Sequence, residues 1–277
     1  QRNVDLTHRY YQLKAKWMGV KQLNWWDRNA PLPGDDHRQF SWDEACHIVL
    51  DAFAGFDVKM AELAKPFFSN NWIDAAPRAG KSSGAFSHPV VPSAHPYILM
   101  NFAGKSRDVM TLAHEMGHGI HQSLAAGQGY LMSDTPLTLA ETASVFGEML
   151  TFKKMLENAK DQNERKVLLA GKVEDMINTV IRQIAFYDFE CKLHEARKAG
   201  ELTPDDINAL WMSVQGESLG PAFEFMDGYE TFWAYIPHFV HSPFYVYAYA
   251  FGDGLVNALY AVYEASPDGF QDKYFAM

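Results

Sequence analysis

The sequence is poor in cysteine, in clustered positive charge and in long hydrophobic runs. Only two of its 277 residues are cysteine, and Cys46 and Cys191 form neither a CxxC metal knuckle nor a disulfide framework. Acidic residues (34) outnumber basic ones (24), and no lysine–arginine run supplies the basic face that nucleic-acid phosphates need. No apolar stretch approaches the roughly 20 residues that cross a bilayer. We therefore expect a reducing compartment and neither a nucleic-acid nor a membrane partner.

Apolar residues, in contrast, are abundant enough to build a real core. They make up 48% of the chain and aromatic residues 14%, which excludes a disordered or low-complexity protein. The length fits one large domain or two coupled halves. No signal-peptide pattern opens the chain, so we expect a cytoplasmic location. Because the chain lacks a starting Met and stops at Met277 without an ending signal, we also expect a piece of a longer protein.

Most of the chain carries helix-forming patterns. Ser41 and Glu44 have the spacing of a capping box, which predicts a helix start. Thr203-Pro204 is a second start signal, an N-cap followed by proline at the first helical position. Ser242-Pro243 repeats it before residues 244–247, whose alternating pattern is compatible with a helix or a strand. Further helical patterns cover residues 9–17, 106–125, 137–157 and 163–199, the last as one helix or a kinked pair.

Between residues 70 and 104 the helical pattern is interrupted by glycine and proline. The pieces 83–87 and 97–102 are short and β-compatible, and they predict strands. We therefore expect a mainly α fold with one small β-sheet just before the helix at 106–125.

The pentapeptide His114-Glu115-Met116-Gly117-His118 is the most informative motif. On a helix, residues four apart share one face, so both imidazoles can reach one metal ion. Glu115 can then act as general base on a water at that metal. The motif also occurs by chance in unrelated proteins, and two ordinary core or surface histidines are the alternative at this point.

The third ligand would distinguish the classes of HExxH protein. A metzincin has Gly and then His at the positions that hold His121 and Leu124 here, so that class is excluded. Glu141 lies in an apolar setting, where a carboxylate is costly to bury without a partner. A metal held by His114, His118 and Glu141 supplies that partner and leaves a coordination position open, as in catalytic zinc sites.

Two further residues share this neighbourhood. Glu148, two turns after Glu141, is either a hydrogen-bond acceptor for a ligand imidazole or an ordinary surface carboxylate. His121 shares the ligand face, and crowding favours a neighbour over a fourth ligand.

The run Thr111–Gln122 resembles the signature of the oligoendopeptidase F family, the bacterial branch of the thimet-oligopeptidase-like zinc metallopeptidases. The resemblance extends over nearly the whole chain. The other stretches that carry it are Tyr11–Lys16, Gly80–Phe86, Ala140–Ser144, Ile236–Phe239 and Pro243–Tyr247.

This resemblance implies the helical, zincin-type catalytic half of a two-lobed enzyme, with one Zn²⁺ at the floor of a deep channel. It implies short peptides as substrates, because only an extended oligopeptide enters such a channel. Family members are longer, so residues 1–277 are expected to form the catalytic metallopeptidase domain, with the N-terminal lobe and the extreme C-terminus missing.

The resemblance also implies a His and Tyr residues over the zinc, as donors to the oxyanion that forms at the scissile carbonyl. His238 and Tyr245 are favoured, and Tyr247 comes next because the tyrosine spacing allows the alignment to slip towards Tyr247 or Tyr249. A half-buried aromatic helix with its hydroxyls at a solvent rim is the alternative for any single tyrosine.

A strand containing Gly84, Ala85 and Phe86 could bind substrate by backbone pairing, with Gly84 allowing close approach. Structural packing explains the glycine equally well.

We therefore expect a zinc-dependent endopeptidase that hydrolyses short oligopeptides, with Glu115 as general base. The alternatives are a metallocarboxypeptidase-like exopeptidase and a non-catalytic peptide-binding fragment. No heptad run indicates an oligomeric state.

Overall fold

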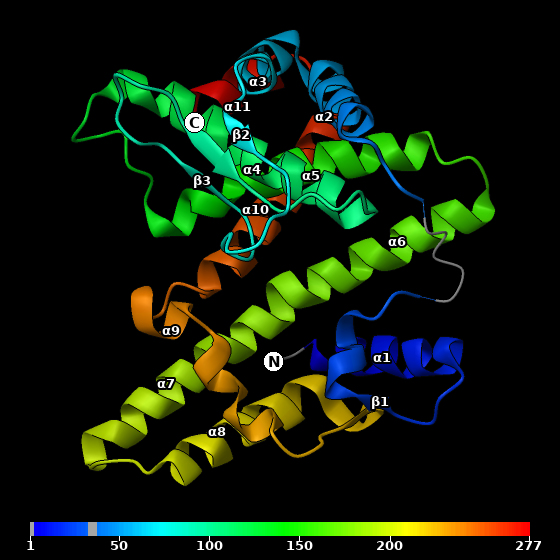
Figure 1. Ribbon diagram of the computed structural model, residues 1–277, viewed down its shortest axis with the longest axis vertical. Helices are drawn as coiled ribbons and strands as arrows, with labels where there is room; N and C mark the ends of the chain where they lie inside the picture. Colours follow the sequence, from blue (N-terminus) through cyan, green and yellow to red (C-terminus); the bar gives the residue numbers. More distant parts are fainter. Residues whose placement is uncertain (1–2, 33–37) are drawn as a thin grey trace. The chain divides into compact units, whose positions relative to one another are not determined.

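The computed structural model describes residues 3–32 and 38–277 of a mainly helical protein (Figure 1). The chain divides into two compact units, which are described separately. The first unit comprises Gln1–Asp35 and Leu169–Phe251, and the second comprises Asp36–Leu168 and Gly252–Met277. Within the described ranges, no helix is both long enough and apolar enough to cross a membrane.

The second unit contains a three-stranded sheet in the order β2-β4-β3. β4 (Tyr97–Leu99) is central, parallel to β2 (Ile73–Asp74) and antiparallel to β3 (Phe86–His88). The expected sheet is therefore present just before the HExxH helix, with shorter strands than expected and with β2 as an unpredicted member. β3 is an edge strand, so one side of its backbone is not paired within the sheet.

Helices cover most of the second unit, and one apolar core lies between them. Asp108 stabilises the start of the HExxH helix, because its carboxylate accepts the N–H groups of Ala103 and Lys105, each at 2.9 Å. The helices that lie wholly in this unit are α2 (Trp42–Phe56), α3 (Val58–Ser69), α4 (Ser106–Ala125), α5 (Ala140–Glu157) and α11 (Phe270–Ala276). The fully buried core side chains include Phe53, Phe67, Leu112, Met116 and Phe146.

The expected capping box at the start of α2 forms only in part. Ser41 Oγ accepts the Glu44 N–H at 3.1 Å. The Glu44 carboxylate accepts a hydrogen bond of 2.9 Å from Arg38. A charged partner outside the helix thus replaces the expected return bond of Glu44, because charge-assisted bonds are the stronger ones.

In the first unit, the long helical pattern at 163–199 forms one continuous helical stretch. It consists of α6 (Gln162–Met176), whose first turns belong to the second unit, a π-helical segment (Ile177–Arg182) and α7 (Gln183–Ala199). The other elements of this unit are α1 (Val4–Met18), α8 (Pro204–Leu219), α9 (His238–His241), the 3₁₀ segments Trp25–Asn29 and Tyr229–Tyr235, and the parallel pair β1 (Leu23–Asn24) and β5 (Phe223–Glu224).

A buried ion pair holds α1 against α6. The Lys14 ammonium is fully buried and donates to Glu174 Oε2 at 2.7 Å and to the Arg28 carbonyl at 2.6 Å. Tyr10 Oη donates to the same Glu174 oxygen at 2.8 Å.

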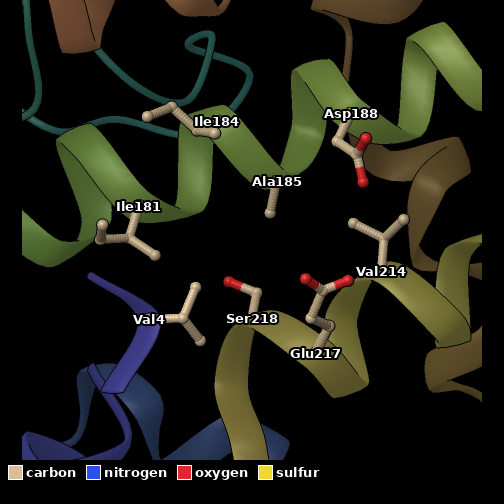
Figure 2. Close-up of a pocket in the computed structure, with 8 residues that line it drawn as sticks. All are labelled: Val4, Ile181, Ile184, Ala185, Asp188, Val214, Glu217 and Ser218. Atoms are coloured by element: carbon tan, nitrogen blue, oxygen red, sulfur yellow. The ribbon is translucent and has the colours of Figure 1, made fainter. Parts of the chain in front are cut away.

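The small cavity between α7 and α8 that Figure 2 shows has a volume of about 30 Å³. It has room for a water molecule but not for an amino-acid residue.

The expected helix start at Ser242-Pro243 is wrong. The next helix, α10 (Tyr247–Ala265), begins several residues later. Phe244 has a φ of +62°, which is not helical, and its N–H donates to Glu190 Oε1 at 2.9 Å. A carboxylate from α7 thus binds the backbone where the sequence pattern predicts a helical turn.

Candidate metal centre

Helices α4 and α5 lie side by side (Figure 1), and two glycines allow their close approach. A Cβ atom at Gly117 would lie 2.4 Å from the Ala143 carbonyl oxygen, and one at Gly147 would lie 2.7 Å from the Ala113 carbonyl oxygen. Both distances are shorter than any real Cβ contact, so neither position accepts a larger residue without movement of the helices. The glycines therefore set the distance between the side chains that project from α4 and α5.

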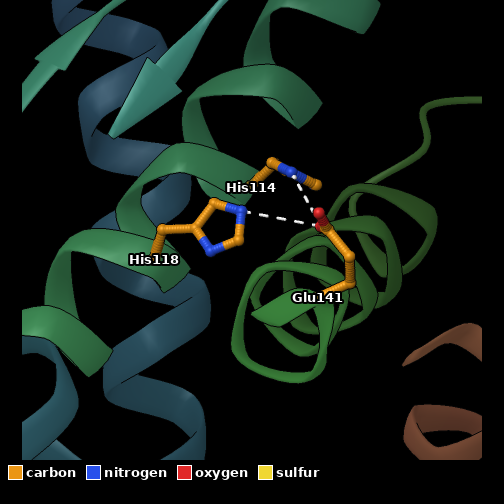
Figure 3. A group of neighbouring side chains, drawn as sticks. All are labelled: His114, His118 and Glu141. Atoms are coloured by element: carbon orange, nitrogen blue, oxygen red, sulfur yellow. Dashed lines mark ion pairs between the residues drawn. The ribbon is translucent and has the colours of Figure 1, made fainter. Parts of the chain in front are cut away.

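Three of these side chains converge between the two helices (Figure 3). The Nε2 atoms of His114 and His118 lie 3.4 and 3.5 Å from Glu141 Oε2, and the three ligand atoms all lie within 4.8 Å of one another. Two ligands of one tetrahedral zinc ion, each at about 2.0–2.1 Å from it, are roughly 3.4 Å apart. The three residues therefore fit a metal ion in donor type and in spacing.

Neighbouring groups hold the ligands in place. His114 Nδ1 lies 2.6 Å from Glu148 Oε1, which leaves Nε2 directed towards Glu141. Burial alone would lower the pKa of His114, but the hydrogen bond and charge of Glu148, together with the charge of Glu141, raise it to about 10. Surroundings that stabilise positive charge on this ring also favour a cation beside it.

Glu115 is buried, with only 5% of its surface exposed. Within the described part of the chain its Oε2 atom has no hydrogen-bond partner. Burial raises the pKa of its carboxyl group, against the opposing charges of His114 and His118. A buried carboxylate with an unused oxygen and a raised pKa can accept a proton at neutral pH.

His121 lies outside this three-residue group. It lines a cavity of about 400 Å³ together with Met60 and Leu124, and burial lowers the pKa of its ring.

The predicted oxyanion donors lie in the first unit, where the structure brings some of them together. The rings of His238 and Tyr245 stack at 5.7 Å, and Tyr249 Oη lies 3.5 Å from His238 Nε2. Tyr247 instead packs edge-on against Tyr187 at 5.6 Å. His238, Tyr245 and Tyr249 therefore form one cluster, and Tyr247 is not part of it.

The predicted substrate-binding residues lie at the start of the edge strand β3. Gly84 and Ala85 precede the strand, and Phe86 opens it with 48% of its surface exposed. Gly84 has a φ of +88° and no atom within 4 Å of its missing Cβ. Its backbone conformation therefore explains the glycine, whereas close packing does not.

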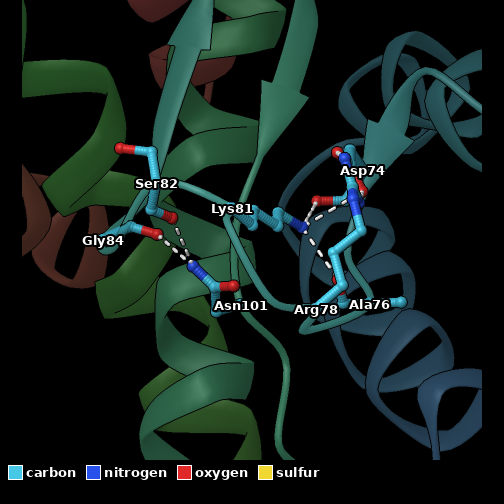
Figure 4. A network of polar contacts seen from close by, with 7 residues as sticks. All are labelled: Asp74, Ala76, Arg78, Lys81, Ser82, Gly84 and Asn101. Atoms are coloured by element: carbon cyan, nitrogen blue, oxygen red, sulfur yellow. Dashed lines mark hydrogen bonds and ion pairs between the residues drawn. The ribbon is translucent and has the colours of Figure 1, made fainter.

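A polar network fixes this loop (Figure 4). Asn101 Nδ2 donates to the carbonyls of Ser82 and Gly84 at 3.0 and 3.2 Å. The Lys81 ammonium donates to the Asp74 carboxylate at 3.0 Å. Side-chain bonds thus hold both the backbone before β3 and its connection to β2.

Sequence reasoning missed two residues that support the centre. Ser144 Oγ donates to Glu141 Oε2 at 2.9 Å and so fixes that carboxylate. A Cβ atom at Gly252 would lie 2.8 Å from Glu141 Cβ, so a glycine of α10 makes room for this residue. Both are small residues whose type indicates no metal chemistry, and only the helix packing reveals their role.

The chain is similar in sequence and in fold to known peptidases. An oligoendopeptidase F homolog of Lactococcus lactis is 34% identical over 252 residues, which are 90% of this chain and 41% of the relative. Oligopeptidase PepF of Bacillus subtilis is 30% identical over 93% of this chain and 38% of its own length. The solved structure of PZ peptidase A with an inhibitor has the same fold, with a TM-score of 0.81 and 17% identity over 99% of this chain and 49% of that one.

The chain spans about two fifths of the length of these curated relatives, for example 41% of the Lactococcus protein. The model of peptidase family M3 matches residues 1–271. The chain therefore belongs to peptidase family M3.

Proposed function

We propose that this chain is the catalytic part of a zinc-dependent endopeptidase that hydrolyses short peptides. One observation carries the proposal: His114, His118 and Glu141 converge within 4.8 Å, beside the buried and unpartnered Glu115 Oε2. Two imidazoles and one carboxylate are the ligand set of known zinc peptidases. A bound zinc would polarise the scissile carbonyl and lower the pKa of water.

Each residue then has a defined task. Glu115 accepts a proton from the attacking water and returns it to the leaving amine. Glu148 orients His114 through the bond at Nδ1. His238 and Tyr245 donate hydrogen bonds to the oxyanion, with Tyr247 as the second choice among the tyrosines.

The edge strand β3 supports a binding mode for the peptide. An extended peptide can add a strand to an exposed sheet edge, with its main chain paired to β3. Phe86 is exposed there, and Gly84 and Ala85 continue the backbone beyond the strand. The names oligoendopeptidase and oligopeptidase among the relatives support short substrates. The free thiols of Cys46 and Cys191 fit a cytoplasmic location.

The test is hydrolysis of an internally quenched peptide whose two termini are blocked. We expect one zinc per chain by metal analysis, cleavage by the zinc-loaded chain, loss of cleavage with a chelator and recovery on adding zinc. Glu115→Gln should retain the metal and lose activity. Hydrolysis that survives both metal removal and Glu115→Gln would refute the proposal.

Two other outcomes identify the alternatives. Cleavage only of peptides with a free terminus indicates an exopeptidase of the metallocarboxypeptidase type. Peptide binding without turnover by the zinc-loaded chain indicates a non-catalytic peptide-binding fragment.

A further inference from the structure

The first unit contains a second cavity, of about 220 Å³, that the proposed reaction does not use. Aromatic side chains from both 3₁₀ segments and from α8 form much of its wall. Arg28 and Arg182 also line it. The aromatic residues at this wall include Trp25, Trp26, Trp211 and Tyr229.

The two arginines have no counter-ion among the residues that the structure describes. Among the described residues, neither guanidinium group takes part in a hydrogen bond or an ion pair, and both Nε atoms are buried. Arg182 lies over the ring of Phe186, at 4.6 Å from its centre. Burial, and then the charge of Arg28, lower the pKa of Arg182 to about 10. Two like charges are therefore held close together in surroundings that disfavour them.

Not every shielded basic side chain of the first unit lacks a partner. Lys14 is also buried, but it has both a carboxylate and a carbonyl partner. Burying a charge without a partner costs several kcal/mol. Both arginines are half-buried and their Nε atoms are shielded from solvent, so a ligand that enters the cavity can supply the missing partner.

The other polar groups at the wall indicate which functional group this ligand carries. Trp25 Nε1 is a buried donor without a partner in the described ranges. Trp211 Nε1 and Tyr229 Oη already donate, to the Tyr229 carbonyl and to Gln215. The buried unused groups, Trp25 Nε1 and the two arginine Nε atoms, are all donors. A carboxylate, which only accepts, matches them and can bind a guanidinium with both oxygens.

The aromatic walls and the volume of the cavity indicate the polarity and the size of the rest of the ligand. The rings of Trp25 and Tyr229 stack at 5.2 Å, and Phe232 lies edge-on to Trp25 at 4.3 Å. At roughly 30 Å³ for each water, the cavity holds about seven waters, the size of one amino-acid residue. An apolar side chain next to the carboxylate would contact the aromatic rings.

We propose that this cavity binds one residue of a peptide through its carboxylate, with Arg28 and Arg182 as the charge partners. Either the C-terminal carboxylate or an acidic side chain supplies this group. That the ligand is a peptide rests on the proposed function, but the preference for a carboxylate does not.

The test measures binding to the chelator-treated, metal-free chain, so its outcome is independent of catalysis. Three tryptophans line the cavity, and their fluorescence reports occupancy, with calorimetry as the second readout. The probes are N-acetylphenylalanine, its neutral amide, N-acetyl-aspartyl-phenylalaninamide and inorganic phosphate. We expect either carboxylate probe to bind roughly 10- to 100-fold more tightly than the neutral amide. The tighter of the two identifies the source of the carboxylate.

The variants are Arg28→Met and Arg182→Met, with Arg9→Met, an exposed arginine on α1, as the matched control. Each cavity variant should weaken carboxylate binding roughly 10- to 100-fold, whereas Arg9→Met should not change it. Without ligand, Arg182→Met should melt at the same or a higher temperature, because it removes a half-buried unpaired charge.

Three results would overturn the proposal. The first is equal binding of N-acetylphenylalanine and its amide. The second is phosphate binding as tight as that of the carboxylates, which indicates a general anion site. The third is a lower melting temperature for Arg182→Met with unchanged binding, which assigns the arginine a structural role. None of these results affects the proposed peptidase activity.

Discussion

Ser144 Oγ donates a hydrogen bond of 2.9 Å to Glu141 Oε2, the same oxygen that faces both His114 Nε2 and His118 Nε2. The serine hydroxyl therefore fixes the direction of the candidate ligand atom. Ser144 is completely buried, so solvent does not compete for this bond.

Ser144→Ala should weaken zinc binding by about 10- to 100-fold, because groups that orient metal ligands have effects of this size. The fold should persist, since a hydroxyl is replaced by hydrogen in a small buried site. Competition with a chromophoric chelator measures the affinity. Ser123→Ala, which removes a hydroxyl bonded to the Gly119 carbonyl of α4, is the matched control and should bind zinc normally.

The close contact of α4 and α5 gives a second prediction. Gly147→Ala should destabilise the second unit by about 1–3 kcal/mol, because the added methyl group overpacks the contact with Ala113. Thermal unfolding followed by circular dichroism measures the change. Gly55→Ala, in α2 with no atom near its missing Cβ, should leave stability unchanged or raise it by up to about 1 kcal/mol. Equal effects of the two substitutions would contradict this account of the helix contact.

Tyr245 and Tyr247 differ in their neighbours, because Tyr245 lies in the cluster with His238 and Tyr249 and Tyr247 does not. Tyr245→Phe should lower kcat by about 10²–10³, the usual effect of losing one oxyanion donor. Tyr247→Phe should have little effect, because that ring packs on Tyr187. Steady-state kinetics with a blocked peptide distinguish the two variants. The reverse order of effects would assign the donor role to Tyr247.

The buried ion pair of the first unit should be costly to break on one side only. Lys14→Met leaves Glu174 partly buried and should reduce stability by about 3 kcal/mol. The exposed pair of Lys198 and Glu195, also in the first unit, is the control, and Lys198→Met should change stability by less than about 1 kcal/mol. Chemical denaturation of both variants measures the difference. A similar loss for both would show that burial does not determine the cost.

Local patterns in the sequence predicted much of the fold and the three residues that converge at the candidate metal centre. The spacing of His114 and His118 is a property of one helix, so periodicity is sufficient to place both on one face. Glu141 could be inferred because a carboxylate in an apolar segment needs a partner. Both inferences depend only on residues close together in the chain.

Features that depend on distant residues could not be predicted. The backbone at Phe244 is determined by Glu190, and no local pattern at Ser242-Pro243 reveals this contact. The strand β2 has only two residues, too few for an alternating pattern. Arg28 and Arg182 are far apart in the sequence, and only the folded first unit brings them to one cavity.

The π-helical segment Ile177–Arg182 ends at one of these arginines. Such a segment accommodates an additional residue within a helix. A homologue that lacked one residue there could keep the helices on either side but would turn its guanidinium group away from the aromatic walls. The length of this segment, more than the identity of its residues, should therefore indicate which homologues retain the proposed carboxylate-binding cavity.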